Sequence, residues 1–248
     1  MEKYADDFLK QLGINKNDAD EKISNSILGG YLGIDGAKNA KNIILANRKA
    51  VTIDLLNYVR QYVKTDAFVK KYNEMRNYYK PKEQLVQTPE EWRIQNIKTN
   101  QEIVAKATEI VKNSKPEFKD IFQKNLDDAK KQLKDAEDTN NKYFVNYKKN
   151  YPQLVKDFKS SYDRSITGWK TKYPDNQLLY VKMRLEQFLD VTKDVDFSAE
   201  LIEKGNKKLF ANPEYERKDS RWKMAFRAGK EVVEPSREFV QKWIEEIQ

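Results

Sequence analysis

The stretch SKPEFKDIFQKNLDDAKKQLKDA, residues 114–136, decides the fold class of this chain. It opens with Ser114-Lys115-Pro116-Glu117, the spacing of a helix start in which a hydroxyl caps free amides and proline occupies the first turn. Apolar residues then recur every three or four positions, as they do along one face of a helix: Phe118, Ile121, Phe122, Leu126, Ala129, Leu133 and Ala136. The stretch therefore predicts an amphipathic α-helix from Lys115 to about Ala136.

Helix signals of the same kind recur along the chain. Thr88-Pro89-Glu90-Glu91 has the pattern of a capping box and predicts a helix from Pro89 to about Asn113. Tyr151-Pro152 and Tyr173-Pro174 each predict the end of one helical stretch and the start of another, because the residue before proline is disfavoured in a helix. We expect the remaining helices at 4–12, closed by Gly13; at 17–29, capped by Asn17; at about 37–63; from Thr65 through Met75; from 142; at 176–191; at 220–228; and at 231–247.

Strand signals compete with helix signals in one place only. Residues 195–201 alternate between apolar and polar, Gly205-Asn206 is a turn pair, and Leu209 begins a second apolar run, which predicts a short hairpin within 195–211. With only 8 Gly and 7 Pro, the chain has few tight turns for a larger sheet. We therefore expect an all-α fold, a multi-helix bundle with long antiparallel helices and this one hairpin.

The length allows one or two domains, and we expect a single helical domain over 1–248. In it, 1–36 form short N-terminal helices and a glycine-rich loop, and 37–248 form the main bundle.

The amino-acid composition limits the kinds of catalytic and metal-binding site that this chain can form. The chain has no His and no Cys, so the commonest nucleophiles, proton shuttles and tight zinc or iron ligands are missing. We expect no metal and no cofactor, and we lean against an enzyme without excluding a carboxylate pair or a Ser/Lys arrangement.

Charge and hydropathy bear on partners and location. The net charge of +8 arises from 47 basic residues interleaved with 39 acidic ones. This pattern favours a solvated surface over a footprint for nucleic acid or for an anionic membrane, so we do not expect nucleic acid as a partner. No apolar run approaches the roughly 18 residues of a membrane span, which predicts a soluble protein. Residues 1–7 lack the apolar stretch of a signal peptide, so the protein is either cytoplasmic or exported with its signal removed.

Two groups of side chains are candidates for binding a ligand. Tyr143, Tyr147 and Tyr151, with Trp169 and Tyr173 beyond them, could stack on sugars or bases, although such spacing more often serves packing between helices. Several arginines near Trp222 could hold a carboxylate or phosphate, although neighbouring acids offer them internal ion pairs. The candidate ligand-binding residues are Trp169, Tyr173, Arg221, Trp222 and Arg227.

Two further patterns favour structural roles. The glycines between Gly29 and Gly36 follow a predicted helix rather than a strand and lack the spacing of a phosphate loop, which favours a turn. Asp190, Asp194 and Asp196 could hold a hard cation, yet they do not match a calcium-loop pattern, which favours a solvated helix end.

Three C-terminal segments carry a resemblance: Val195–Leu201, Asn212–Glu216 and Trp222–Lys230. Together with the Gly-Gly-Tyr of residues 29–31, they resemble uncharacterised helical proteins of Bacteroidetes-type bacteria. Such proteins often carry an export signal, so the resemblance implies a helical fold and a place outside the cytoplasm. It implies no activity and no site, and we expect a non-catalytic structural or interaction protein. The alternative is a module that binds a saccharide, a peptide or an anionic metabolite.

Overall fold

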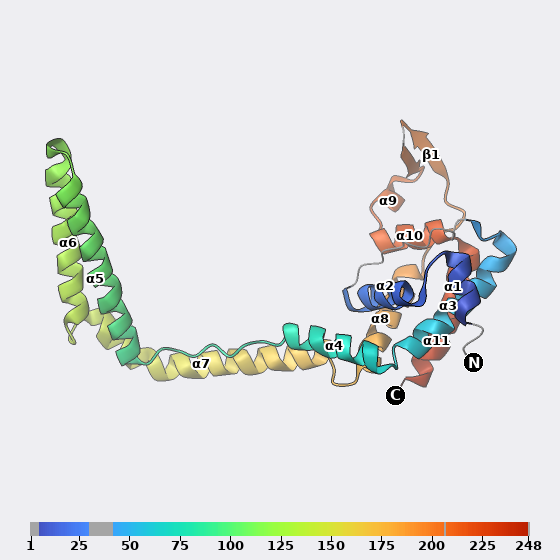
Figure 1. Ribbon diagram of the computed structural model, residues 1–248, viewed down its shortest axis with the longest axis horizontal. Coiled ribbons are helices and arrows are strands. Elements are labelled where there is room, and N and C mark those ends of the chain that lie inside the picture. Colours follow the sequence, from blue (N-terminus) through green and yellow to red (C-terminus); the bar gives the residue numbers. More distant parts are fainter. Residues whose placement is uncertain (1–4, 30–41, 206, 248) are drawn as a thin grey trace. The chain divides into compact units, whose positions relative to one another are not determined.

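The fold is all-α with one short hairpin in a computed structural model that describes residues 5–29, 42–205 and 207–247 (Figure 1). This confirms the predicted fold class. The elements in chain order are α1 (Ala5–Leu12), α2 (Lys16–Gly29), α3 (Leu45–Tyr62), α4 (Asp66–Tyr78), α5 (Pro89–Asn113), the 3-10 turn η2 (Pro116–Phe118), α6 (Lys119–Glu137), α7 (Lys142–Lys172), α8 (Gln177–Thr192), β1 (Leu201–Lys204), β2 (Lys207–Phe210), α9 (Pro213–Glu216), α10 (Ser220–Ala228) and α11 (Lys230–Glu246).

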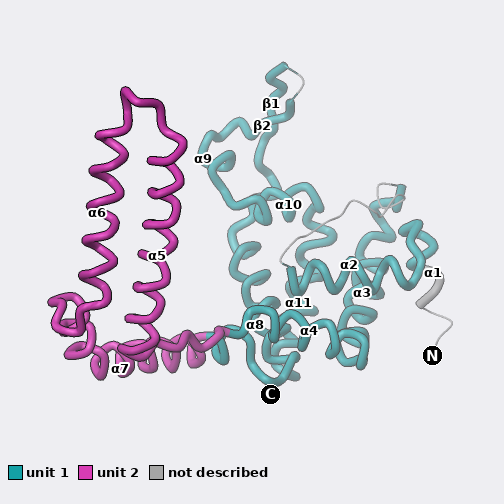
Figure 2. The backbone as a smooth tube through the Cα atoms, turned by 60° about the vertical axis from the view of Figure 1, so that its left-hand side comes forward, with its two compact units in different colours: residues 1–80, 169–248 teal, residues 81–168 magenta. Residues whose placement is uncertain are grey.

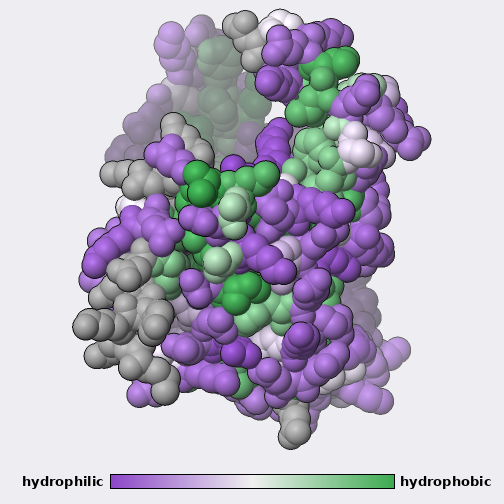
Figure 3. Space-filling view, turned by 90° about the vertical axis from the view of Figure 1, so that its right-hand side faces the viewer, coloured by the Kyte–Doolittle hydropathy of each residue, from purple (hydrophilic) through white to green (hydrophobic). Residues whose placement is uncertain are grey.

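The chain forms two compact units (Figure 2). Unit 1 combines residues 1–80 with residues 169–248, and unit 2 consists of residues 81–168. The expectation of a single domain stays a prediction. Hydrophilic residues cover most of the surface seen in Figure 3, with small hydrophobic patches between them, in keeping with a chain that is 35% charged.

Unit 1 is built around an aromatic core from α3, α4, α8 and α11. Phe68 and Tyr72 of α4 and Trp243 of α11 are among its largest fully buried side chains. Helix α11 packs along α3, and Arg60 of α3 pairs with Glu246 of α11 at 3.2 Å. Segments from the two ends of the chain therefore share one core.

Two smaller groups extend unit 1. Residues of α1 and α2 bury Phe8, Leu9 and Leu12 against Val51 of α3. At the C-terminal side β1 and β2 pair antiparallel, with Leu201 opposite Phe210, inside the predicted range 195–211. Phe210 is buried beneath α10, its ring 5.7 Å from that of Trp222.

Unit 2 consists of the antiparallel pair α5 and α6, most of α7 and the extended segment 81–88. The predicted capping box is present: the Thr88 hydroxyl accepts from the Glu91 amide, and the Glu91 carboxylate accepts from the Thr88 amide. Segment 81–88 runs beside α7, where the Tyr147 hydroxyl donates to the carbonyl of Gln87 at 2.8 Å. Leu126 and Ala129 of α6 are the only buried side chains of the unit.

Two expected N-terminal boundaries are wrong. Helix α2 begins at Lys16, and Asn15 rather than Asn17 caps it by accepting from the Asp18 amide at 2.9 Å. The helix expected from Ala37 begins only at Leu45, because Ile44 is extended. Ile44 and Leu45 are each 64% exposed, so neither side chain packs against the core where α3 begins. Residues 30–41 lie outside the described part of the chain.

Two other expectations fail in the middle of the chain. Ser114 donates back to the Val111 carbonyl at 2.8 Å and so ends α5 instead of starting the next helix, which begins at Lys119 after the 3-10 turn. Pro152 lies inside α7 and does not break it. Pro152 and Lys148 are both exposed, so water can bond the carbonyl that the missing proline amide leaves free.

Candidate functional site

Trp169 and Tyr173 lie in the core of unit 1. The Trp169 indole is 8% exposed, donates to the Arg76 carbonyl at 3.0 Å and lies 4.1 Å beneath the Arg76 guanidinium. The Tyr173 ring stacks on Tyr79 at 5.5 Å with the planes 1° apart. Both side chains therefore hold the end of α7 against α4, and a ligand could stack on them only by displacing these contacts.

The other three predicted ligand-binding residues belong to α10. Trp222 is 2% exposed, and its indole donates to the Asp194 carbonyl at 3.2 Å. Arg221 pairs with Asp219 at 3.0 Å, and Arg227 is exposed. The five residues thus fall into two clusters, one around Trp169 and one around Trp222, and their binding of a ligand stays a prediction.

The three aspartates near the hairpin are each engaged by a different neighbour. Asp190 pairs with Lys193, and Asp194 pairs with Lys218. The Lys218 hydrogen bond lowers the pKa of Asp194, while hydrogen bonds from Ser198 and Tyr215 lower the pKa of Asp196. In the described ranges no group of three acids could hold a metal ion. Of the Gly29–Gly36 segment, all but Gly29 lies outside those ranges.

A polar cluster joins α2, α3 and α4 at a surface depression of about 540 Å³. The Ser24 hydroxyl shares a 2.8 Å hydrogen bond with the hydroxyl of Tyr62 and accepts from the Lys71 ammonium at 3.4 Å. Serine, lysine and tyrosine together can support nucleophilic catalysis when the serine faces substrate. Ser24 is only 2% exposed and donates to the Asp20 carbonyl at 2.8 Å, an arrangement that suits joining the three helices.

Rings from α5 and α7 stack at the base of the helix pair in unit 2. Trp92 lies 4.8 Å from Tyr147 with the planes 12° apart, and 6.4 Å from Phe144 at 14°. Tyr143 stands outside this stack and is 65% exposed. The aromatic series therefore serves mainly to pack α5 against α7, the structural interpretation of its four-residue spacing.

The far end of the α5–α6 pair carries an exposed apolar patch. The patch comprises Ile103, Ile110, Phe118 and Ile121, which are 43%, 50%, 49% and 60% exposed. With about 3.6 residues per turn, the isoleucines of both helices fall on one side of the pair, and the Phe118 ring lies 6.4 Å from Phe122. Ile94, at 56% exposure, falls on the opposite side. We refer to the four residues as the tip patch.

A basic band runs along α7. The helix holds 8 basic and 2 acidic residues, so it contributes 8 − 2 = +6 of the chain's net charge of +8. All eight basic side chains are exposed, and within the described residues none forms an ion pair. Sequence reasoning missed this band because the cations are spaced for a helix instead of forming a run; the net charge of a 31-residue window would have revealed it.

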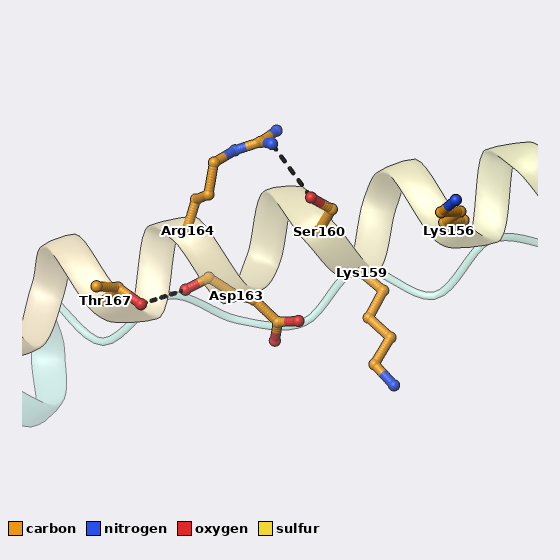
Figure 4. Close-up of a pocket in the computed structure, with 6 residues that line it drawn as sticks. All are labelled: Lys156, Lys159, Ser160, Asp163, Arg164 and Thr167. Carbon is orange, nitrogen blue, oxygen red and sulfur yellow. Dashed lines mark hydrogen bonds between the residues drawn. The ribbon is translucent and has the colours of Figure 1, made fainter.

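The side chains of the band project in different directions (Figure 4). Lys156 points toward the viewer, while Arg164 and Lys159 extend to opposite edges of the helix. They line a shallow depression of about 500 Å³ with Ser160, Asp163 and Thr167, all from one helix. The arrangement offers a broad positive face and does not enclose a small molecule.

No helix of the described chain is long and apolar enough to cross a membrane. No protein family, no curated protein and no solved structure matches this chain.

Proposed function

We propose that this chain is a non-catalytic interaction protein and that unit 2 is its binding element. The proposal is supported by the distribution of solvent-exposed hydrophobic side chains between the two units. Among described residues, 10 of the 17 exposed large hydrophobic side chains lie in unit 2, against 2 of the 23 buried hydrophobic ones. A unit with almost no interior of its own gains little from keeping so many apolar side chains, so we assign them to contact with a partner.

The tip patch is the part of unit 2 best suited to this contact. Ile110, Phe118 and Ile121 lie near the connection between α5 and α6, and Ile103 lies about two turns before Ile110 on α5. An apolar stripe on a helix pair docks readily onto a stripe on another helix. Each of the four side chains is about half exposed, so covering them all would stabilise a complex by about 3–6 kcal/mol before the cost of association. We therefore propose that the partner is a protein that presents an apolar helix face.

The first experiment replaces Phe118 by a photoreactive phenylalanine analogue and irradiates cells of the source organism. The same analogue at Lys98, an exposed polar position of α5, is the control. We would then purify a protein that crosslinks to the analogue at position 118 but not to the analogue at position 98. Calorimetry would measure the affinity of this protein for the chain. A crosslinked product that is a second copy of the chain would contradict the proposed foreign partner.

Matched variants then test the assignment of the tip patch. We expect Ile110→Ser with Ile121→Ser to weaken binding at least about tenfold, because two half-exposed side chains lose their contact area. Ile94→Ser removes an equally exposed isoleucine from the other side of the pair and should leave the affinity unchanged. Equal weakening by Ile94→Ser, or no weakening by the double variant, would contradict the proposal.

A further inference from the structure

The basic band of α7 carries an inference that does not depend on the tip patch. Between Lys142 and Arg164 six cations project from the helix: Lys142, Lys148, Lys149, Lys156, Lys159 and Arg164. With about 3.6 residues per turn, they fall within an arc of about 160°. Asp163 lies inside this arc, and Asp157 lies at its edge.

The opposite side of α7 is partly covered. Phe144 and Tyr147 face α5 and segment 81–88, as their stacking on Trp92 and the hydrogen bond from Tyr147 to Gln87 show. Pro81 and Gln84 lie beside Phe158 at the other end of the same segment. The basic arc is thus a solvent-facing side of an amphipathic helix whose apolar side is partly covered within the unit, with Val155 and Phe158 still 39% and 43% exposed.

We propose that this arc lies on the surface of a bilayer that contains anionic lipids. The complementary charge is the first argument: each lysine or arginine near such a surface adds a similar favourable increment, and six act together. The chain contributes no acidic partners to these cations within its described residues, so nothing internal has to be displaced.

Shape favours a bilayer over a nucleic acid. The cations span about 33 Å along the helix at about 1.5 Å per residue. A planar surface can meet them all at once, whereas the grooves of duplex DNA make a full turn in about 34 Å and curve away from a straight rod.

The choice of cation points the same way. Five of the six cations are lysines, compact and strongly hydrated charges that suit a diffuse headgroup layer, and arginine is the usual residue for bidentate phosphate recognition. Val145, 47% exposed, lies within the arc and adds one apolar contact at the interface.

The test measures partitioning of the full chain onto vesicles of phosphatidylcholine with and without phosphatidylserine, by sedimentation at low and at physiological salt. The variant Lys142→Gln, Lys149→Gln, Lys156→Gln removes three cations from the arc. The control Lys98→Gln, Lys106→Gln, Lys112→Gln removes three exposed lysines from α5 and changes the net charge equally. Circular dichroism and melting temperature establish that all three proteins are equally folded.

We expect binding only to vesicles with phosphatidylserine and weaker binding at higher salt. The α7 variant should lose roughly a hundredfold in partition coefficient and the α5 variant far less. Absence of binding at low salt, or equal losses in the two variants, would overturn the proposal. If the chain bound duplex DNA or RNA more tightly than the vesicles, and if the α7 substitutions weakened that binding more than they weakened vesicle binding, the arc would be assigned to nucleic acid instead.

Discussion

Replacing Tyr72 by Phe should destabilise unit 1 by an amount that depends on pH. Tyr72 is 0% exposed, and its hydroxyl donates to the Pro174 carbonyl at 2.6 Å, which ties α4 to the turn before α8. Removing the hydroxyl leaves that carbonyl without its donor, which costs about 1–3 kcal/mol. We expect this loss of unfolding free energy at pH 7.

The alkaline range gives the sharper test. Burial raises the pKa of Tyr72 from 10.0 to about 12, the nearby charge of Arg76 only partly opposing it. A raised pKa means that the stabilisation from the hydroxyl is fully present below pH 10, where both states are protonated, and is lost as pH rises toward 12, because the unfolded chain releases its proton first. A shift of two units corresponds to about 2.7 kcal/mol, so the difference between the two proteins should fall toward zero over this range.

Urea unfolding followed by tryptophan fluorescence at a series of pH values measures this difference. Burial also raises the pKa of Tyr180, but Tyr180 is present in both proteins, so its own ionisation lowers the stability of both. Tyr78→Phe, which removes a hydroxyl from a side chain that is 81% exposed, should change stability by less than about 0.5 kcal/mol. A constant difference between Tyr72→Phe and the parent from pH 7 to pH 12 would refute the reasoning.

Substitutions at glycine, proline and helix-cap positions provide further predictions, each measured by urea or thermal unfolding. Gly229→Ala should destabilise by about 1–3 kcal/mol, because φ is +91° and a Cβ would lie 2.8 Å from the Glu231 carboxylate; unchanged stability would contradict the observed conformation. Gly168→Ala, in a helix with nothing within 4 Å, should instead stabilise by about 0.5–1 kcal/mol, and a loss would mean an unseen contact. Pro152→Ala should stabilise α7 by up to about 3 kcal/mol without adding helix content, because the helix is already continuous at this position; a gain of helix content by circular dichroism would contradict that continuity. Thr88→Ala should cost about 1 kcal/mol through loss of the capping box, visible as fraying of α5 in amide exchange.

Local chemistry made most of the fold predictable from sequence. The Thr88 capping box, the closing glycine Gly13 and the hairpin turn at Gly205 depend on a few adjacent residues, and the structure has them where they were expected. Ser114 and Pro152 were interpreted by the same local rules and were wrong. A serine hydroxyl can bond the helix behind it as well as the one ahead, and an exposed proline can be accommodated inside a long helix.

The candidate sites were less predictable because they depend on what the fold brings together. Trp169 and Trp222 were selected for their chemistry, but only tertiary packing decides that both indoles are buried. Phe118 and Ile121 of the tip patch belong to the apolar face predicted for residues 115–136, and Ile121 is exposed because α6 has α5 on one side only. Periodicity predicts which residues share a face but not whether another element covers that face.

The discontinuity of unit 1 determines the order in which the protein can fold on the ribosome. All of unit 2 is synthesised before α11, the helix that packs against α3, and the Arg48–Glu231 and Arg60–Glu246 pairs join residues 183 and 186 positions apart. The small cluster around Phe8 and Val51 can form early, but the aromatic core of unit 1 must wait for α8 and α11, which are made only after more than half of translation. During that interval the apolar residues of α3 and α4 that later contact α8 and α11 stay uncovered, which leaves the unfinished half of unit 1 open to aggregation.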